Sequence, residues 1–234
     1  MPDLHVVSKE ITEALSHEAL DGLGCSDFGI TVLRGAQSWD NAREGLAFTI
    51  GHDERDAPYA VDSDGNELTN VKLSFSDEGD YRAFAWAVTT PGSPLLGLGI
   101  DLASTDDFKE TRVGAERFIR LIFSDAEHRI ARDIQADDPA FSYATLFGAK
   151  EASFKSTAQP LRSWYQSHDR ELTFEVRHFS MTEPGIERGE QRDAAAQHAM
   201  DHLGIGSINV YHTRVEGMAL VIATALAPQE SAEV

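Results

Sequence analysis

The sequence has one cysteine, no long hydrophobic run and few basic residues, and each shortage excludes a class of protein. Because Cys25 is alone, an internal disulfide bond is excluded and a reducing compartment is favoured. No apolar stretch approaches the roughly 20 residues that cross a bilayer. The first five residues also lack the basic flank and apolar run of a signal peptide. We therefore expect a cytoplasmic protein that does not bind membranes.

Basic residues are outnumbered by acidic ones. The chain has 20 Lys and Arg against 39 Asp and Glu, which gives a formal net charge of −19. Only residues 112–132 and 150–162 concentrate basic side chains, and acids are interleaved in both. A protein this acidic repels the phosphates of nucleic acids unless its cations form one patch. We therefore expect no nucleic-acid partner.

What is present is typical of a folded globular protein. Of the 234 residues, 41% are hydrophobic and 25% are charged. This length suffices for one domain or for two closely packed halves with a substantial core. A faint similarity between residues 71–88 and 208–225, with a Pro-Gly break at 91–94, favours two related halves.

The periodicity of apolar residues predicts an α+β fold. Helical spacing predicts helices over residues 8–22, 37–48, 108–118, 125–134, 139–155 and 194–202. Alternation predicts strands over residues 28–33, 71–76, 81–88, 95–102, 172–179, 207–211 and 217–226. Ile11 is expected to face inward from the first helix, Pro160 to end the fifth, and Gly97 and Gly99 to form a turn.

Two segments carry residues suited to chemistry on phosphates. Asp101 follows an apolar run, at the place where a strand ends, while Lys150, Glu151 and Lys155 lie on adjoining turns of a predicted helix. Two carboxylates and two ammonium groups are what a magnesium ion and a phosphate require. Simpler explanations are available: Asp101 caps the next helix, and Glu151 pairs with Lys155 at the i, i+4 spacing.

The order of these motifs resembles the 4′-phosphopantetheinyl transferase superfamily, which includes the holo-acyl-carrier-protein synthases. The resemblance covers roughly residues 56–180 and is most specific where Gly99-Ile100-Asp101 is followed by the segment 147–155. It implies two pseudo-symmetric halves, each with a small antiparallel sheet packed on helices. We expect the N-terminal half to span residues 1–94 and the C-terminal half, which carries both motifs, to span residues 95–234.

The resemblance also implies an activity and a set of site residues. Coenzyme A would donate its 4′-phosphopantetheine group to a serine of an acyl or peptidyl carrier protein, with Mg²⁺ on the pyrophosphate. Asp101 and Glu151 would be the metal ligands, and Glu151 would also help to remove the serine proton. The residues matching the coenzyme A site are Lys150, Lys155, Ser76 and Asp77, and Lys155 would also act in catalysis.

The chain departs from the family pattern at three positions, and each departure removes a side chain that the expected site would use. Ala103 stands where the longer members have a second acid, two residues after the Asp of the Gly-Ile-Asp motif. Asp77 replaces a histidine that meets the 3′-phosphate of coenzyme A, and Ala57 replaces a cation in a Gly-Lys/Arg-Pro triplet. An anion facing a phosphate costs on the order of 1–4 kcal/mol near a surface.

Three hypotheses therefore stand. The first is a magnesium-dependent phosphopantetheinyl transferase. The second is a non-catalytic member of the same fold that binds a partner. The third is an unrelated α+β enzyme acting on a small molecule, which requires the resemblance to be chance. For the transferase, the arginines within residues 112–132 are the candidate docking face for an acidic carrier protein.

Overall fold

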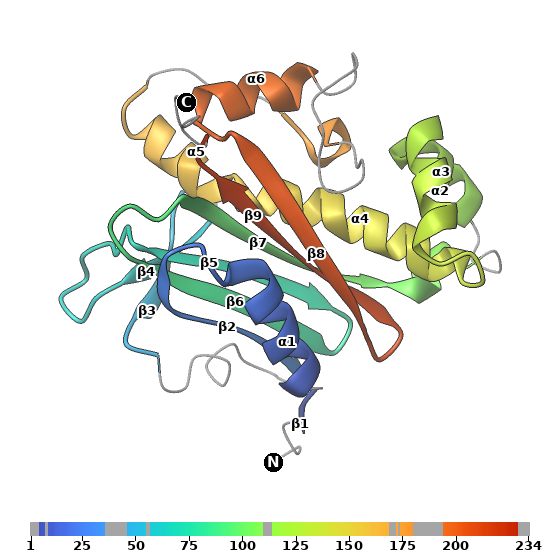
Figure 1. Ribbon diagram of the computed structural model, residues 1–234, viewed down its shortest axis with the longest axis horizontal. Helices are drawn as coiled ribbons and strands as arrows, with labels where there is room; N and C mark the ends of the chain where they lie inside the picture. Colours follow the sequence, from blue (N-terminus) through green and yellow to red (C-terminus); the bar gives the residue numbers. More distant parts are fainter. Residues whose placement is uncertain are drawn as a thin grey trace, which may run out of the picture.

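The computed structural model has the predicted α+β fold, with antiparallel sheets and helices packed against them (Figure 1). It describes residues 5–7, 9–35, 46–54, 57–109, 114–168, 172, 174–179 and 194–228. Within those residues, none of the helices combines the length and the apolar character needed to cross a bilayer.

Two larger sheets are drawn from different parts of the chain. One has the strand order β1-β2-β6-β5, with bounds His5–Val6, Cys25–Arg34, Tyr81–Thr89 and Val71–Glu78. The other has the order β7-β9-β8, with bounds Leu95–Ser104, Met218–Leu226 and Ser207–Val215. A third, two-stranded sheet joins β3 (Thr49–His52) to β4 (Pro58–Val61). The boundary at residue 94 falls between the two larger sheets and stays a prediction.

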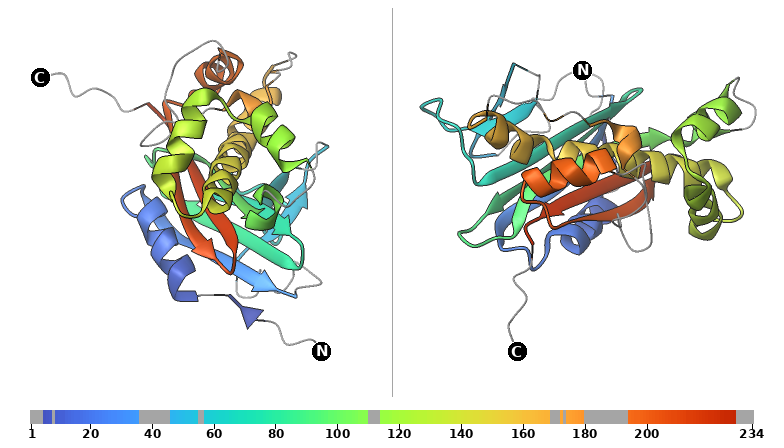
Figure 2. Two further views of the ribbon diagram at one scale, coloured as in Figure 1. Left: turned by 90° about the vertical axis from the view of Figure 1, so that its right-hand side faces the viewer. Right: turned by 90° about the horizontal axis from the view of Figure 1, so that it is seen from above.

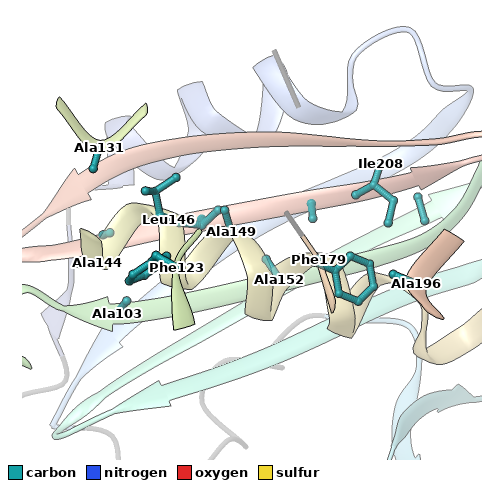
Figure 3. Close-up of a cluster of buried hydrophobic side chains, with 14 of the residues drawn as sticks. Ala103, Phe123, Ala131, Ala144, Leu146, Ala149, Ala152, Phe179, Ala196 and Ile208 are labelled. Atoms are coloured by element: carbon teal, nitrogen blue, oxygen red, sulfur yellow. The ribbon is translucent and has the colours of Figure 1, made fainter. Parts of the chain in front are cut away.

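Helix α4 (Pro139–Ser156) carries the second motif and packs across β7 and β9 (Figures 1 and 3). Leu146, Ala149 and Ala152 of α4 are fully buried in the core between the helix and the sheet. The start of α4 is fixed by Asp138, which accepts a hydrogen bond from the amide of Phe141 at 3.1 Å. The strong burial of small residues on one face brings helix and sheet close together.

Gly97 and Gly99 explain how close this approach is. Both lie inside β7, so the predicted turn is wrong. A Cβ atom at Gly97 would overlap the carbonyl oxygen of Ser156, and one at Gly99 would overlap that of Ala152. Glycine is therefore required at both positions because the backbone of α4 lies directly on the strand.

A second core forms beneath helix α1 (Lys9–Leu20), on the far side of the strands from α4 (Figure 2). Leu15 and Leu20 of α1 pack there with Val32 of β2 and Ile222 of β9. Because β9 is covered on both faces, every one of its residues is buried. The two large sheets thus share one continuous interior.

The edges of the two large sheets meet through serine side chains. The amide of Ile100 donates to Ser74 Oγ at 3.0 Å, and the amide of Leu102 donates to Ser76 Oγ at 3.1 Å. These hydroxyl groups of β5 thereby satisfy amides of β7 that lie at the edge of its sheet. The contact fixes β5 beside the Gly-Ile-Asp motif.

The remaining helices surround α4. They are η2 (Thr105–Phe108), α2 (Ala115–Ile122), α3 (Asp125–Ile134), α5 (Ala158–Tyr165), η3 (Val176–His178) and α6 (Ala194–His202). Helix α3 begins at Ser124, where Ser124 and Glu127 form a capping box.

Several predicted boundaries are wrong. Residues 176–178 form a 3-10 helix in place of a strand over 172–179, and the helix predicted over 108–118 lies instead at Ala115–Ile122. Helix α4 ends at Ser156, while Pro160 lies in the first turn of α5, where proline fits because the first amides lack partners. Ile11 is 40% exposed and does not face the core. Most of the helix predicted over 37–48 lies outside the described residues.

Candidate functional site

Asp101 lies at the centre of the candidate site, on strand β7 and facing α4. Its side chain is buried, and its Oδ1 atom accepts a hydrogen bond from Ser76 Oγ at 2.9 Å. A Cβ atom at Gly148 would lie 3.4 Å from Asp101 Oδ2, so the second oxygen faces the helix. A side chain at Gly148 would crowd Val221 of β9, whose Cγ2 atom would lie 2.9 Å from the added Cβ atom.

Lys155 supplies the positive charge beside this carboxylate. Its Nζ atom lies 2.6 Å from Asp101 Oδ1 and also donates to Ser76 Oγ and to the carbonyl of Ile100, both at 3.3 Å. The Lys155 side chain is 29% exposed, whereas that of Asp101 is 7% exposed. The ammonium group therefore joins a buried carboxylate to the surface, where a phosphate can reach it.

Glu151 lies one helical turn before Lys155 and is half-buried. Burial raises the pKa of its carboxyl group, and the negative charge of Asp101 raises that pKa further, while Lys155 opposes the change. The effect of Asp101 on Glu151 means that the two acids lie close enough to repel each other. The structure thus brings together Asp101, Glu151 and Lys155, although the two segments are far apart in the sequence.

The donors present fit a magnesium ion. Burial raises the pKa of Asp101, against the lowering effects of Lys155 and Ser76, so both carboxyl groups are costly to ionise without added positive charge. Mg²⁺ is commonly bound by one or two carboxylates, with substrate phosphates and water completing the shell. Asp101 and Glu151 are such a pair, and a divalent cation between them would relieve their repulsion.

Among the described residues, no third protein ligand is found near this pair. Ala103, on the same face of β7 as Asp101, is buried in the core with Phe108 and Phe123. Asp106 does not replace the missing acid, because it pairs with Lys109 at 2.5 Å on the surface. No group of three or more His, Cys, Asp or Glu that could hold a metal occurs within the described part of the chain. The predicted ligand set is thus two carboxylates.

The structure does not bring Lys150 to the site. Its Nζ atom lies 2.7 Å from Glu127 Oε1, with both side chains 1% exposed, and it also donates to the carbonyl of Phe179. Lys150 is adjacent to Glu151 in the sequence, but the helical rotation of about 100° per residue directs it toward α3. It joins three segments of the core and is not accessible to coenzyme A.

A cleft opens beside Lys155, between β5 and the α4–α5 junction, and we call it the β5–α5 cleft. Its volume is about 470 Å³, within the range of small-molecule sites. Its lining consists of Ile50, His52, Asp53, Ala57, Pro58, Leu73, Ser74, Phe75, Asp77, Phe154, Lys155, Thr157, Ala158, Leu161, Arg162 and Tyr165. The cleft extends from Lys155, the partner of Asp101, to the two-stranded sheet β3-β4.

The cleft includes two of the positions that depart from the family pattern. Asp77 lines it from the end of β5, and Ala57 lines it from the chain just before β4. Ser76, in contrast, is buried and turned toward β7, where it contacts Asp101 and Lys155. Ser76 is therefore placed to orient the site's charged groups, while Asp77 is placed to meet a ligand.

Sequence reasoning missed two charged residues in the surroundings of the site. Arg162 reaches the cleft from α5 and lies with its guanidinium carbon 3.5 Å from the centre of the Tyr59 ring. No sequence motif distinguishes an arginine on a short helix, so the sequence did not indicate that Arg162 would line the cleft. Glu127, the partner of Lys150, did have one: the Ser124-x-x-Glu127 spacing of a capping box.

Comparison with known proteins shows which family has a sequence pattern like that of this chain. A family model described as the 4′-phosphopantetheinyl transferase superfamily matches residues 97–216, just over half of the chain. The match includes β7, α4 and β8, and so includes Asp101, Glu151 and Lys155. No curated protein matches the chain.

Proposed function

We propose that this chain, which belongs to the 4′-phosphopantetheinyl transferase superfamily, transfers 4′-phosphopantetheine from coenzyme A to a serine of an acyl or peptidyl carrier protein in the cytoplasm. Membership excludes the hypothesis that the resemblance is chance. The observation that carries the proposal is the grouping of Asp101, Glu151 and Lys155, of which Lys155 lines a cleft of about 470 Å³. Phosphoryl transfer needs mainly positioning and charge neutralisation, and this site offers both.

The proposed step uses Glu151 and Lys155 in different roles. The serine oxygen bonds to the β-phosphorus of coenzyme A, the P–O bond of the phosphoanhydride breaks, and 3′,5′-ADP leaves. Glu151 accepts the serine proton, directly or through water; the raised pKa of its carboxyl group makes it a better base. Lys155, one turn along the same face of α4, lies where its ammonium group can hold the phosphopantetheine phosphate.

Mg²⁺, held by Asp101 and Glu151, would supply the remaining neutralisation of the pyrophosphate oxygens. Before the donor binds, the ammonium group of Lys155 compensates the charge of Asp101 at 2.6 Å. The hydroxyl of Ser76 holds the same oxygen of Asp101 in place. These contacts keep the carboxylate oriented, so that little reorganisation is needed when a phosphate arrives.

The test is a direct assay of transfer. The chain is incubated with coenzyme A, Mg²⁺ and an apo-carrier protein, and the carrier is weighed by mass spectrometry. We expect the mass of one phosphopantetheine group to be added, and Asp101→Ala and Glu151→Ala to slow the reaction at least about 100-fold. Lys9→Ala, at an exposed residue of α1, is the matched control and should leave the rate unchanged.

The alternative is a non-catalytic member of the family, and Ala103 is the observation in its favour, because it removes an acid from the expected ligand set. Absence of transfer, together with no thermal stabilisation of the chain by coenzyme A, would support that alternative. Transfer that persists in both carboxylate variants would contradict the roles given to them.

Helix α2 is the proposed docking face for the carrier. It exposes Phe118 and Leu121, at 36% and 63%, beside the exposed Arg117 and Arg120. The Phe118 ring lies 5.5 Å from that of Phe147, which is one helical turn before Glu151. An apolar surface flanked by arginines suits an acidic helix, and this one borders the carboxylate pair.

The positive charge of this surface and its apolar contact can be tested by separate substitutions, at Arg120 and at Leu121. We expect Arg120→Glu and Leu121→Asp each to raise the KM for the carrier at least about 10-fold, while the KM for coenzyme A stays unchanged. Lys9→Glu makes the same change of charge at an exposed position of another helix, α1, and should leave both constants as they are. An equal effect of Lys9→Glu would reject α2 as a specific docking face.

A further inference from the structure

The β5–α5 cleft is lined by two carboxylates, Asp53 and Asp77, and by two cations, and this balance bears on which donor it accepts. Its lining cations are Lys155 and Arg162, and Arg82 lies beside Asp77. Each is within 4 Å of at least one acid. The acids that face these three cations are Asp53, Glu67, Asp77 and Asp101.

Both lining cations face acids of the protein. Lys155 pairs with Asp101 at 2.6 Å. Arg162 lies between two acids, with its Nη2 atom 3.0 Å from Glu67 and its Nε atom 3.7 Å from Asp53. One face of its guanidinium group is covered by the ring of Tyr59. The positive charge of Arg162 is therefore balanced by two acids, while its buried Nη1 atom has no hydrogen-bond partner among the described residues.

Asp77 places an accessible negative charge in the cleft. Its side chain is 68% exposed, and its closest cation, Arg82 Nη1, is 3.7 Å away, a distance too long for a hydrogen bond. An accessible carboxylate accepts hydrogen bonds from hydroxyl groups and repels phosphates. In dinucleotide-binding folds the same distinction separates ligands: an acid selects a free ribose hydroxyl, and an arginine selects its phosphate ester.

We propose that Asp77 makes the cleft specific for a donor whose ribose has a free 3′-hydroxyl, so that 3′-dephospho-coenzyme A is preferred to coenzyme A. The inference rests on the proposed transferase function and changes its donor. The 3′-phosphate adds two negative charges to a cleft where Asp77 is exposed and where both described lining cations already face acids. The pyrophosphate, which both donors share, is left to Lys155 and the carboxylate-bound Mg²⁺.

The transfer step stays balanced with this donor. The serine oxygen bonds to the β-phosphorus, the phosphoanhydride P–O bond breaks, and the serine proton goes to Glu151 or water. The leaving group is adenosine 5′-monophosphate in place of 3′,5′-ADP. The two reactions therefore release nucleotides that chromatography separates.

Competition between the two donors is the first test. With both at equal concentration, apo-carrier and Mg²⁺, we expect release of adenosine 5′-monophosphate to exceed that of 3′,5′-ADP at least 10-fold. A second measurement needs no turnover: adenosine 5′-monophosphate should stabilise the chain against heat more than 3′,5′-ADP does, with or without Mg²⁺. Preference for coenzyme A in the first test, or for 3′,5′-ADP in the second, would overturn the proposal.

A matched pair of variants assigns the preference to Asp77. Asp77→Lys should improve kcat/KM for coenzyme A at least 10-fold relative to the dephospho donor. Asp80→Lys makes the same change of charge three residues away, on the turn between β5 and β6 where Asp80 pairs with Arg34, and should leave the preference unchanged. Equal shifts in both variants would mean that overall charge, not Asp77, decides.

Failure of the inference is distinct from failure of the proposed function. If coenzyme A is the better donor, transfer stands and only the selectivity is rejected. If neither donor is used, the transferase proposal fails, and the nucleotide-binding measurement on wild type and Asp77→Lys still decides what the cleft accepts.

Discussion

Lys155 Nζ lies 2.6 Å from Asp101 Oδ1 and joins the end of α4 to the middle of β7. A carboxylate this buried is costly to ionise, and burial raises its pKa despite the lysine. Ionised Asp101 is therefore stabilised mainly by this one ammonium group and the hydroxyl of Ser76. The same ammonium group is the cation that faces the cleft, so the stability of the site and its proposed chemistry depend on one residue.

Replacement of Lys155 by Met should destabilise the protein in a pH-dependent way. Removing one partner of a largely buried pair costs roughly 1–3 kcal/mol, less than a fully buried pair because Lys155 is 29% exposed. Without Lys155 the pKa of Asp101 rises further, so the native state binds this proton more strongly than the unfolded state. The loss of stability should therefore grow as pH rises and shrink toward pH 4.

Urea unfolding of Lys155→Met and wild type at pH 5 and pH 8 measures this effect. Lys9→Met, on the exposed face of α1, is the control and should change the unfolding free energy little at either pH. A loss that is equal at both pH values would mean that Lys155 does not set the ionisation of Asp101.

Lys150 should behave as a structural residue. Its pair with Glu127 has 1% exposure on both sides, so Lys150→Met leaves a buried carboxylate without its cation and should cost about 3–5 kcal/mol. The double variant Lys150→Met, Glu127→Leu removes both charges and should recover much of that loss. Thermal unfolding of the three variants checks the coupling, and KM for the donor should match wild type in whichever of them fold.

A catalytic or donor-binding role for Lys150 predicts a different outcome. The double variant would then be stable but would have a donor KM raised several-fold. That result would mean that the helix turns Lys150 toward the cleft during the reaction.

The strand that carries Asp101 and the helix that carries Glu151 could be predicted because both segments are local patterns with clear periodicity. An apolar run ending in Gly99-Ile100-Asp101 predicts a strand, and the spacing after Asp138 predicts a helix. Which way each charged residue points was harder to predict. Lys150 and Lys155 look alike in the sequence, and only the packing of α4 on α3 and β7 separates a buried ion pair from a site residue.

Gly97 and Gly99 show why tertiary contacts were the weakest part of the prediction. Glycine in a sequence indicates a turn as readily as a close approach of two backbones, and the choice depends on a partner far along the chain. Here the partners are Ala152 and Ser156 of α4. The strand expected over 172–179 was wrong for a related reason: residues 176–178 form a 3-10 helix, and Phe174 and Phe179 on either side of it pack into the core around α4.

Substitution of Gly99 by Ala should therefore be severe. The added Cβ atom would overlap the carbonyl oxygen of Ala152, and the helix would have to move away from the strand that carries Asp101. We expect a loss of about 3 kcal/mol or more in unfolding free energy, or failure to fold. Soluble yield and chemical denaturation measure this outcome.

Gly65→Ala is the control for Gly99→Ala. Gly65 has a positive φ of 85° in an open turn, with no atom within 4 Å of an added Cβ. It should lose only about 1–2 kcal/mol, from backbone strain alone. A loss at Gly99 no greater than that at Gly65 would reject the close packing of α4 on β7.

Replacement of Glu151 by Gln should stabilise the protein while abolishing transfer. Burial and the charge of Asp101 raise the pKa of Glu151, so the native state holds this proton more tightly than the unfolded state does. Stability therefore falls as pH rises from the ordinary carboxyl pKa through the raised value, and the full penalty is present above it. Glutamine removes the penalty, so the gain should be present at pH 7–8 and vanish near pH 4.

Differential scanning calorimetry of Glu151→Gln should show a Tm about 1–3 °C higher than wild type at pH 7.5. Glu13→Gln, at an exposed position of α1, should leave the Tm unchanged. Mg²⁺ binds the native state only where its ligands are intact, so added Mg²⁺ should raise the Tm of wild type more than that of the variant. A lower Tm for Glu151→Gln would mean that the carboxylate is kept for stability, and would remove the physical reason to place it in the reaction.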